Sequence, residues 1–250
     1  MKRALIAALM LTAASCMGQA ANPGLLAWIA TQTAASTTLV TNGLVAYWKL
    51  DNNYVDSYGT NDGTSVLSTW TNGVDGVALH ASYAYTLNPD WNVACGRAGD
   101  LMPTSAVSVA CWVQSTAAQS SFGGIIKGPQ DGPNGGYILV IDSAEKIRFY
   151  IDQNGAGSWA YASGNAALTE DTWYHLVGTW DGTTVKLYVN NVLQTTTGSA
   201  SVISYGTVDS DAHMRWYTAK NMIGILDEAR IHNIALTTNQ ISELYNEFSP

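Results

Sequence analysis

The end of the chain, residues 222–250, constrains the fold more than any other stretch, because a strand pattern there passes directly into an amphipathic helix. Strand-forming apolar residues come first: Met222, Ile223, Ile225, Leu226 and Ile231. Thr237 and Gln240 then have the spacing of a capping box, which satisfies free backbone groups where a helix begins. One helical face follows at i, i+3, i+4 and i+7: Ile241, Leu244, Tyr245 and Phe248. We therefore predict a fold that closes on a short C-terminal helix.

Turn signals divide the rest of the chain into short runs of strand-forming residues. In the clearest case, Asp181-Gly182 joins residues 173–180 to residues 185–189, and Asn190-Asn191 then turns the chain back. Asp-Gly and Asn-Asn pairs supply the positive φ angles that tight hairpin turns need. About a dozen strands at this spacing are typical of two packed antiparallel sheets. The sequence therefore predicts an all-β protein, a two-sheet antiparallel β-sandwich with a short C-terminal helix.

The composition narrows the class of protein and of partner. Only 12% of residues are charged, whereas the chain has 9 Trp and 13 Tyr, a balance that favours an extracellular β-sandwich over a cytosolic helical enzyme. The formal net charge is −8 and basic residues do not cluster, which argues against a nucleic-acid partner. The acidic excess suits solubility outside the cell and offers oxygen ligands to Ca²⁺.

The N-terminus has the order of a secretory signal. Two basic residues precede an uncharged apolar run at residues 4–14, and Gly-Gln-Ala follows at residues 18–20. The run is too short to span a bilayer as a helix. We predict a signal peptide over residues 1–20, cleaved after Ala20, and hence a protein that is secreted, periplasmic or at the cell surface. The alternative is a lipoprotein anchored through Cys16.

Residues 21–43 are uncharged and rich in Thr, Ala and Ser. We interpret them as a linker that leads into one domain at residues 44–250. Residues 22–43 could instead form an extended arm that adds a strand to a neighbouring copy, which would allow self-association. No later stretch is long and apolar enough to anchor the chain, so we do not expect a transmembrane protein.

Two cysteines remain after the signal peptide, Cys95 and Cys111. In an exported protein such a pair can form one disulfide. Cys111 also lies in an alternating strand pattern over residues 106–114, where it would be a small, buried and unpaired apolar residue. The sequence leaves both interpretations open.

Four segments carry a family resemblance: an opening strand (residues 44–51), an Asp-Ser-Tyr-Gly turn (residues 55–63), a central hairpin (residues 172–190) and a C-terminal signature (residues 224–231). In this order they resemble the laminin G-like jelly-roll domain of the concanavalin A-like lectin/glucanase superfamily, in its bacterial pentraxin-like form. The resemblance implies a jelly-roll sandwich for nearly the whole globular part. It leaves the function open, because this fold carries lectins, adhesion modules, glycanases and structural domains.

Catalysis would need a constellation that the sequence lacks. Glucanases of this fold carry a Glu-x-Asp-x-x-Glu pattern, which places carboxylates on one face of a strand. The nearest counterpart is Asp227-Glu228, and adjacent strand residues point to opposite faces. His175 lies in an apolar strand and is interpreted as a hydrogen-bonded core residue. We therefore predict no catalytic residues and no enzyme.

The resemblance also implies a structural calcium ion, which family members often hold between the early Asp-rich turn and the last strand. The matching ligands are Asp56, Asn61, Asp62 and Asp227. Hard oxygen ligands on a tight turn suit Ca²⁺. The alternative is that the turn residues only bond to backbone N–H groups, and that Asp227 pairs with Arg230 or Arg148.

Sugar recognition needs aromatic rings and a few polar groups on an accessible surface. Five aromatic residues in or near predicted loops are the candidate ligand-binding residues: Trp70, Trp91, Trp159, Trp216 and Tyr217. Partial burial is the alternative for each of them. The sequence thus predicts a secreted, non-catalytic binding module for a carbohydrate or for a cell-surface or extracellular partner, as in cell adhesion. The alternatives are a self-assembling structural surface protein that uses the N-terminal arm and, third, a glycan-active enzyme.

Overall fold

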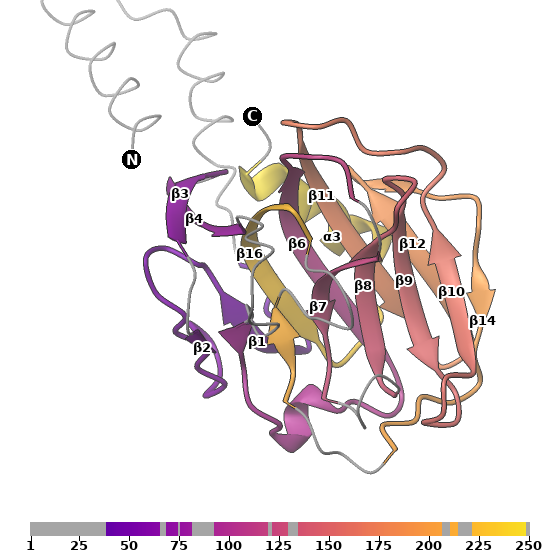
Figure 1. The fold of residues 1–250 in the computed structure, drawn as a ribbon. Coiled ribbons are helices and arrows are strands. Elements are labelled where there is room, and N and C mark those ends of the chain that lie inside the picture. The colour runs from indigo at the N-terminus through magenta and orange to yellow at the C-terminus, as the bar shows by residue number, and fades with distance from the viewer. Residues whose placement is uncertain are drawn as a thin grey trace, which may run out of the picture. The chain divides into compact units, whose positions relative to one another are not determined.

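A computed structural model describes most of the globular part of the chain (Figure 1). The described residues are 39–65, 69–74, 76–81, 93–119, 122–129, 135–206, 211–214 and 222–248. One compact unit begins at Val40, a few residues before the predicted start of the domain. The predicted signal peptide, Cys16 and most of the proposed N-terminal arm lie outside the described residues. Within the described ranges, no helix is both long and apolar enough to cross a membrane.

The larger of two antiparallel sheets has nine strands among the described residues. Seven of them follow the order β13-β12-β11-β6-β16-β4-β3, while β1 also pairs with β16 and β14 with β12. The strands are β1 (Leu44–Trp48), β3 (Thr69–Gly73), β4 (Gly76–Ala81), β6 (Val107–Ser115), β11 (Trp173–Trp180), β12 (Thr184–Val189), β13 (Val192–Leu193), β14 (Gly198–Ser199) and β16 (Gly224–His232).

The second sheet has seven strands in the described ranges, in the order β10-β9-β8-β7-β15-β5-β2. They are β2 (Thr64–Ser65), β5 (Val93–Ala94), β7 (Gly123–Lys127), β8 (Tyr137–Ile141), β9 (Ile147–Asp152), β10 (Trp159–Ser163) and β15 (His213–Met214). A short 3₁₀ helix, η1 (Gly99–Leu101), follows β5, and the α-helix α3 (Thr238–Phe248) closes the described chain. The prediction of a two-sheet sandwich with a C-terminal helix is confirmed.

The predicted central hairpin is formed by β11 and β12, which pair from Leu176 opposite Val189 to Trp180 opposite Val185. Asp181 holds the turn, because its Oδ1 accepts hydrogen bonds from the N–H groups of Thr183 and Thr184. The next turn places Asn190 and Asn191 at φ 48° and 65°. These are the left-handed conformations that asparagine tolerates better than most residues.

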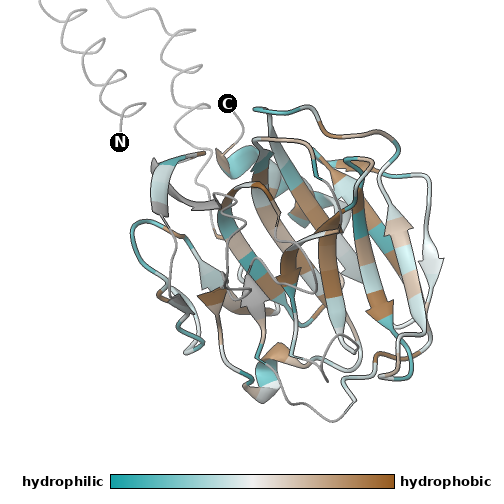
Figure 2. Ribbon diagram, viewed as in Figure 1, coloured by the Kyte–Doolittle hydropathy of each residue, from teal (hydrophilic) through white to brown (hydrophobic). Residues whose placement is uncertain are grey.

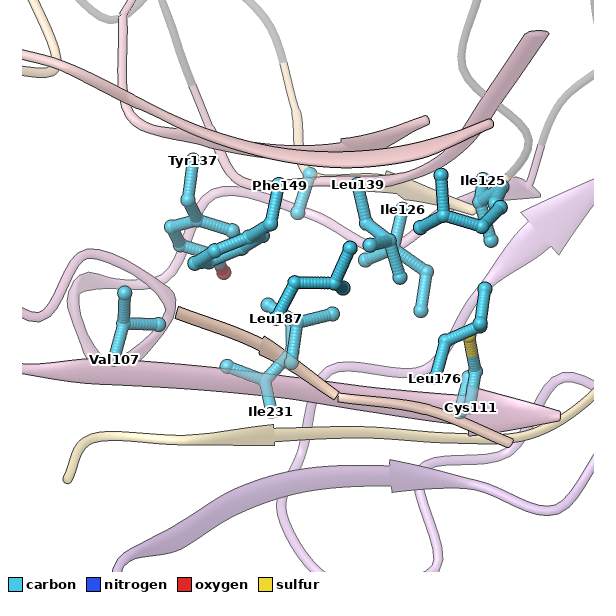
Figure 3. Close-up of a cluster of buried hydrophobic side chains, with 14 of the residues drawn as sticks. Val107, Cys111, Ile125, Ile126, Tyr137, Leu139, Phe149, Leu176, Leu187 and Ile231 are labelled. Carbon is cyan, nitrogen blue, oxygen red and sulfur yellow. The ribbon is translucent and has the colours of Figure 1, made fainter. Parts of the chain in front are cut away.

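The hydrophobic core lies between the two sheets. Figure 3 shows side chains of β8 and β9, such as Leu139 and Phe149, pointing toward Leu176, Leu187 and Ile231 of the opposite sheet. In Figure 2, hydrophobic residues concentrate along the strands, and many connecting segments are hydrophilic. Because side chains alternate along a strand, the burial of one set fixes the next set on the outer face.

The helix α3 packs on the outer face of the nine-stranded sheet through Ile241 and Leu244, which contact Ala110 and Val177 in one buried cluster. The predicted capping box is present. Thr237 N donates to Gln240 Oε1 at 2.9 Å, and Gln240 N donates to Thr237 Oγ1 at 3.4 Å. The remaining helical-face residues, Tyr245 and Phe248, are half-buried rather than enclosed.

Of the two interpretations that the sequence left open for the cysteines, the disulfide is contradicted, because Cys95 and Cys111 are separate buried thiols. Cys111 lies in β6 of the nine-stranded sheet, whereas Cys95 follows β5 of the other sheet and its Sγ lies 3.6 Å from the Val93 carbonyl. Facing sheets are about 10 Å apart, and a disulfide needs Cα atoms within about 7 Å. Burial raises the pKa of the Cys111 thiol, which makes it unreactive.

Gly178 gives a test of the packing between the sheets. A Cβ at this position of β11 would overlap the ring of Phe149. We expect Gly178→Ala to lower the free energy of unfolding by about 1–3 kcal/mol in urea denaturation, because overpacking forces neighbouring atoms to move. Gly99→Ala is the matched control, since a Cβ there meets no atom within 4 Å. Equal stability of the two variants would contradict this account of the core.

Candidate functional site

Aromatic side chains gather on the outer face of the seven-stranded sheet, where β9 pairs with β10. In β9, Phe149 points into the core, so Arg148 and Tyr150 point outward. In β10, Trp159 and Tyr161 share that outer face, and Tyr161 lies directly opposite Tyr150 in the register. Phe122, just before β7, joins them from across the sheet through its contact with Arg148. We call these five residues, Phe122, Arg148, Tyr150, Trp159 and Tyr161, the aromatic platform.

Three rings of the platform contact one another, with Tyr150 next to both Tyr161 and Trp159. The Tyr150 ring lies 5.1 Å from that of Tyr161 and 5.8 Å from that of Trp159, the latter in an edge-to-face arrangement. Tyr161 is 39% exposed and Phe122 48% exposed, although both are large hydrophobic residues. Exposed aromatic rings that already contact each other lose little conformational entropy when a ligand stacks on them.

Arg148 supplies the polar part of the platform. Its guanidinium carbon lies 5.4 Å from the Tyr161 ring centre and 5.6 Å from that of Phe122, within cation–π range. Its Nη1 donates to Tyr150 Oη at 3.2 Å, and its Nη2 lies 2.7 Å from Asp142 Oδ2. The platform therefore combines flat apolar surfaces with a fixed group of N–H and O–H donors, which suits a ligand that has apolar faces and hydroxyl groups.

The sequence predicted part of this site. Trp159 lies in the platform, whereas Trp70 lies in β3 of the other sheet, half-buried against the core with its ring 5.0 Å from that of Tyr54. Trp91, Trp216 and Tyr217 lie outside the described residues. The candidate ligand-binding residues from the sequence did not include Phe122, Arg148, Tyr150 or Tyr161. The signal for Tyr161 was the alternation Trp-Ala-Tyr-Ala in β10, which puts two large rings on one face.

The predicted calcium ligands do not form a vacant oxygen site. Asp56 Oδ1 accepts from the N–H groups of Tyr47, Tyr58 and Gly59. Its Oδ2 accepts from the backbone and side-chain N–H groups of Asn61. A carboxylate has about four lone-pair sites, so these five donors saturate it. The residues therefore do not fit a calcium ion at Asp56.

Two other predicted ligands, Asp62 and Asp227, accept hydrogen bonds from the backbone. Asp62 Oδ1 accepts from Asp56 N at 2.8 Å, and Asp227 Oδ2 accepts from Val74 N at 2.9 Å, in the connection between β3 and β4. The loop thus brings Asp56, Asn61 and Asp62 together as turn-forming residues. Asp227 instead bonds to the connection between β3 and β4. Among the described residues, no group of three or more His, Cys, Asp or Glu side chains could hold a metal ion.

The prediction that Asp227 and Glu228 alternate between opposite faces of a regular strand is wrong, because a register shift interrupts β16 there. Asp227 pairs with Trp112 and Arg230 pairs with Ala110, so β16 contains one extra residue in this interval. Glu228 adopts a left-handed conformation (φ 54°), as residues in β-bulges can. The bulge turns Glu228 toward Arg230, which lies two residues later on the same strand.

Glu228 belongs to an ion-pair cluster beneath α3, formed by Tyr47, Glu228, Arg230 and Glu247. Arg230 Nη2 lies 3.3 Å from Glu228 Oε2, and its Nη1 lies 2.7 Å from Glu247 Oε2. Tyr47 donates its hydroxyl to Glu228, and the Arg230 guanidinium lies 4.1 Å from the Tyr47 ring centre. Two carboxylates share one guanidinium here, and Glu228 is only 4% exposed. The cluster stabilises the position of the helix and is closed to a large substrate.

Burial shifts the pKa values of the ionisable groups beneath α3. Burial, with smaller contributions from Asp227 and Glu247, raises the pKa of Glu228 to about 8. Burial, with a contribution from the charge of Arg230, lowers the pKa of His175 to about 3 and that of His232 to about 4. His175 is thus buried and neutral, as predicted, but the predicted hydrogen bonding is not seen at its Nδ1, which has no partner among the described residues.

Sequence comparison finds one matching family and no matching curated protein. The sequence model of a laminin G family, described as the concanavalin A-like lectin/glucanases superfamily, matches residues 82–242. This match covers more than half of the chain and confirms the resemblance inferred from the four sequence segments.

Solved structures share the fold at low sequence identity. Domain 4 of AbnA, an extracellular arabinanase from Geobacillus stearothermophilus solved with arabinotriose, is 23% identical, with a TM-score of 0.66; the match covers 81% of this chain and 98% of that chain. The binding domain of Paraclostridial Mosquitocidal Protein 1 is 13% identical, with a TM-score of 0.65, and the match covers 82% and 52%. A Trypanosoma rangeli sialidase is 15% identical, with a TM-score of 0.60, and the match covers 81% of this chain and only 32% of the sialidase.

The raised pKa of Glu228 makes stability depend on pH. Between 4.5, the ordinary value, and about 8, folded Glu228 holds a proton that the unfolded chain releases, so stability falls as pH rises. Folded His175 and His232 are neutral where the unfolded chain is charged, so below about 6.5 they act in the opposite direction. Between pH 6.5 and 8 we expect the free energy of unfolding to fall by about 1–2 kcal/mol in urea denaturation.

Glu228→Gln should flatten this decrease, because the amide does not titrate. Glu243→Gln is the matched control, since Glu243 is an exposed acid on α3, the helix that covers Glu228. It should keep the wild-type slope. The same slope in Glu228→Gln and in the wild type would contradict the assignment.

The saturated carboxylate of Asp56 leads to a prediction about metal removal. Asp56→Asn should lower the free energy of unfolding by about 1–3 kcal/mol, because one amide nitrogen replaces an oxygen that accepts hydrogen bonds. We expect the same loss in excess calcium and in excess chelator, measured by thermal denaturation. Asp51→Asn, at an exposed acid of the same loop, should be nearly neutral. A calcium-dependent increase in Tm that Asp56→Asn removes would restore the calcium hypothesis.

Proposed function

This chain belongs to the concanavalin A-like lectin/glucanases superfamily, and we propose that it is a non-catalytic module that binds carbohydrate on its aromatic platform. The observation that carries the proposal is the exposure of Tyr161 and Phe122 on either side of a fixed guanidinium. A pyranose or furanose ring has apolar C–H faces and a rim of hydroxyl groups. Ring stacking recognises the faces, and the donors of Arg148 and Tyr150 lie beside the rings to bond with the hydroxyls.

The position of the acidic side chains supports a non-catalytic role. Glycoside hydrolysis uses two carboxyl groups on either side of the scissile bond. Glu228 and Asp227 are buried, Glu228 beneath α3 and Asp227 against the β3–β4 connection. Asp142, beside the platform, is buried and paired with Arg148. None of these three carboxylates has the access that a general acid or a nucleophile requires.

The comparisons support a glycan as the class of ligand. The chain spans nearly the whole of an arabinanase domain whose structure was solved with arabinotriose. It spans about a third of the sialidase, so the likeness does not extend to that whole protein. We infer recognition of sugar rather than sialidase or arabinanase activity.

We also propose that the protein acts outside the cytoplasm. The basic, apolar and small-residue order of residues 1–20 supports export, and Cys16 offers lipid anchoring as the alternative. A binding face rich in tyrosine and tryptophan would then meet polysaccharides at the cell surface or in the surrounding medium. Mass spectrometry of the mature N-terminus distinguishes cleavage after Ala20 from acylation of Cys16.

The experiment that tests the function is a glycan array followed by calorimetry on the best ligand. We expect Trp159→Ala and Tyr161→Ala each to weaken binding by about 1–3 kcal/mol, a loss of roughly tenfold or more in affinity, because each removes a stacking surface. Thermal denaturation of both variants should remain close to that of the wild type, since neither ring is enclosed in the core.

Tyr58→Ala is the matched control. Tyr58 is 48% exposed, comparable to Phe122 and Tyr161, but lies in the loop after β1 rather than on β9 or β10. Its removal should leave glycan affinity unchanged. The proposal would be overturned if the folded protein bound no glycan on the array, or if Tyr58→Ala and Tyr161→Ala weakened glycan affinity equally.

A further inference from the structure

Arg148 is the only charged residue among the five of the platform, and its charge is compensated. One side of the guanidinium forms the 2.7 Å ion pair with Asp142, and the other donates to Tyr150 Oη. The rings of Phe122 and Tyr161 lie against it. Arg148 therefore presents to a ligand a neutralised, ring-flanked donor group rather than a free positive charge.

The fold holds Asp142 in a fixed position beside Arg148, where it compensates the charge of the guanidinium. The side chain is 3% exposed and follows the last residue of β8. Its Oδ1 accepts from Ala144 N at 2.8 Å and from Lys146 N at 3.0 Å, which holds the turn into β9. Because one oxygen holds the turn, the other is fixed opposite Arg148. Removing Asp142 from this ion pair would leave the charge of Arg148 uncompensated.

Lys146, which immediately precedes β9 and is half-buried, is a further positive charge beside Arg148 and Asp142. Asp152, at the end of β9 and opposite Trp159 in the register, is a second buried carboxylate, with its oxygens bonded to the N–H groups of Gly135, Asn154 and Gly157. The whole chain has a formal net charge of −8. Near the platform Asp142 and Asp152 therefore offset the charges of Arg148 and Lys146, and the overall negative charge repels an acidic polymer.

We propose that Asp142 determines the charge selectivity of the platform, so that it binds uncharged glycan chains and rejects uronic-acid polymers. The inference rests on the proposed function and adds the class of ligand. A guanidinium without Asp142 would be free to bind a carboxylate in the two-point geometry that arginine favours. Asp142 occupies that position with a carboxylate of the protein itself.

The test compares Asp142→Asn with the wild type on neutral and acidic probes. Asparagine keeps the Oδ1 acceptor that holds the turn, removes the charge and places an amide N–H donor where Oδ2 accepted from Arg148. Linear arabinan and hydroxyethylcellulose serve as neutral probes and polygalacturonate as the acidic one, in affinity electrophoresis and calorimetry. We expect the wild type to prefer a neutral probe, and Asp142→Asn to gain about tenfold in affinity for polygalacturonate, which is about 1.4 kcal/mol. Added salt should weaken this gained binding, because it depends on charge.

Two variants control for charge and for folding. Asp181→Asn removes one negative charge from another aspartate that holds a hairpin turn, 4.0 Å from Lys186. Asp181 lies at the turn between β11 and β12 in the other sheet, away from the platform. Asp181→Asn should leave the selectivity unchanged. Asp142→Asn combined with Arg148→Met should lose the gained affinity for polygalacturonate. Thermal denaturation of each variant checks the fold.

The outcomes separate the two proposals. If neutral glycan binds and Tyr161→Ala weakens it, but Asp142→Asn leaves the ratio of affinities unchanged, the role of Asp142 is overturned and the proposed function stands. A gain in Asp181→Asn equal to that in Asp142→Asn would also overturn it. If no probe binds either protein and the glycan array is blank, the proposed function fails and the inference fails with it.

Discussion

The inward packing of β9 against the opposite sheet is the constraint on which the rest of the structure depends. Phe149 fits over Gly178 of β11, where any Cβ would occupy the space of the ring. With Phe149 pointing inward, Arg148 and Tyr150 must point outward, because a strand alternates its faces. A shift of one residue in register would bury Arg148 and expose Phe149. The platform therefore forms only when β9 packs into the core in this register.

The two outer faces of the sandwich use arginine in similar ways and with different consequences. Arg230 is enclosed by Glu228 and Glu247 beneath α3, and Arg148 is paired with Asp142 on the open face. Both guanidinium groups lie near aromatic rings, where their weak hydration is an advantage. Their different exposure gives them different roles. The covered Arg230 pairs stabilise the contact with α3, and the Arg148–Asp142 pair lies where a ligand can reach the adjoining rings.

Local patterns in the sequence were enough for the sandwich, the β11–β12 hairpin and the capped helix. In each case the decisive residues are close in sequence: Asp181 with Thr184, or Thr237 with Gln240. The platform could not be predicted in the same way, because Phe122 reaches Arg148 only through the pairing of β7, β8 and β9. The alternation in β10 predicts that Trp159 and Tyr161 share one face. The fold is needed to show that this face is the accessible outer face of the seven-stranded sheet.

The fold class and the family could be predicted from the sequence, because alternation, turn chemistry and helix capping act between near neighbours. The use of individual polar groups depended on the assembled fold. It saturated Asp56 with N–H donors, placed Cys95 and Cys111 in different sheets and inserted the bulge that turns Glu228 toward Arg230. The physical reason is the same in each case: the donors, acceptors and distances that define a polar group's role come from segments remote in sequence, which meet only when the sheets have formed.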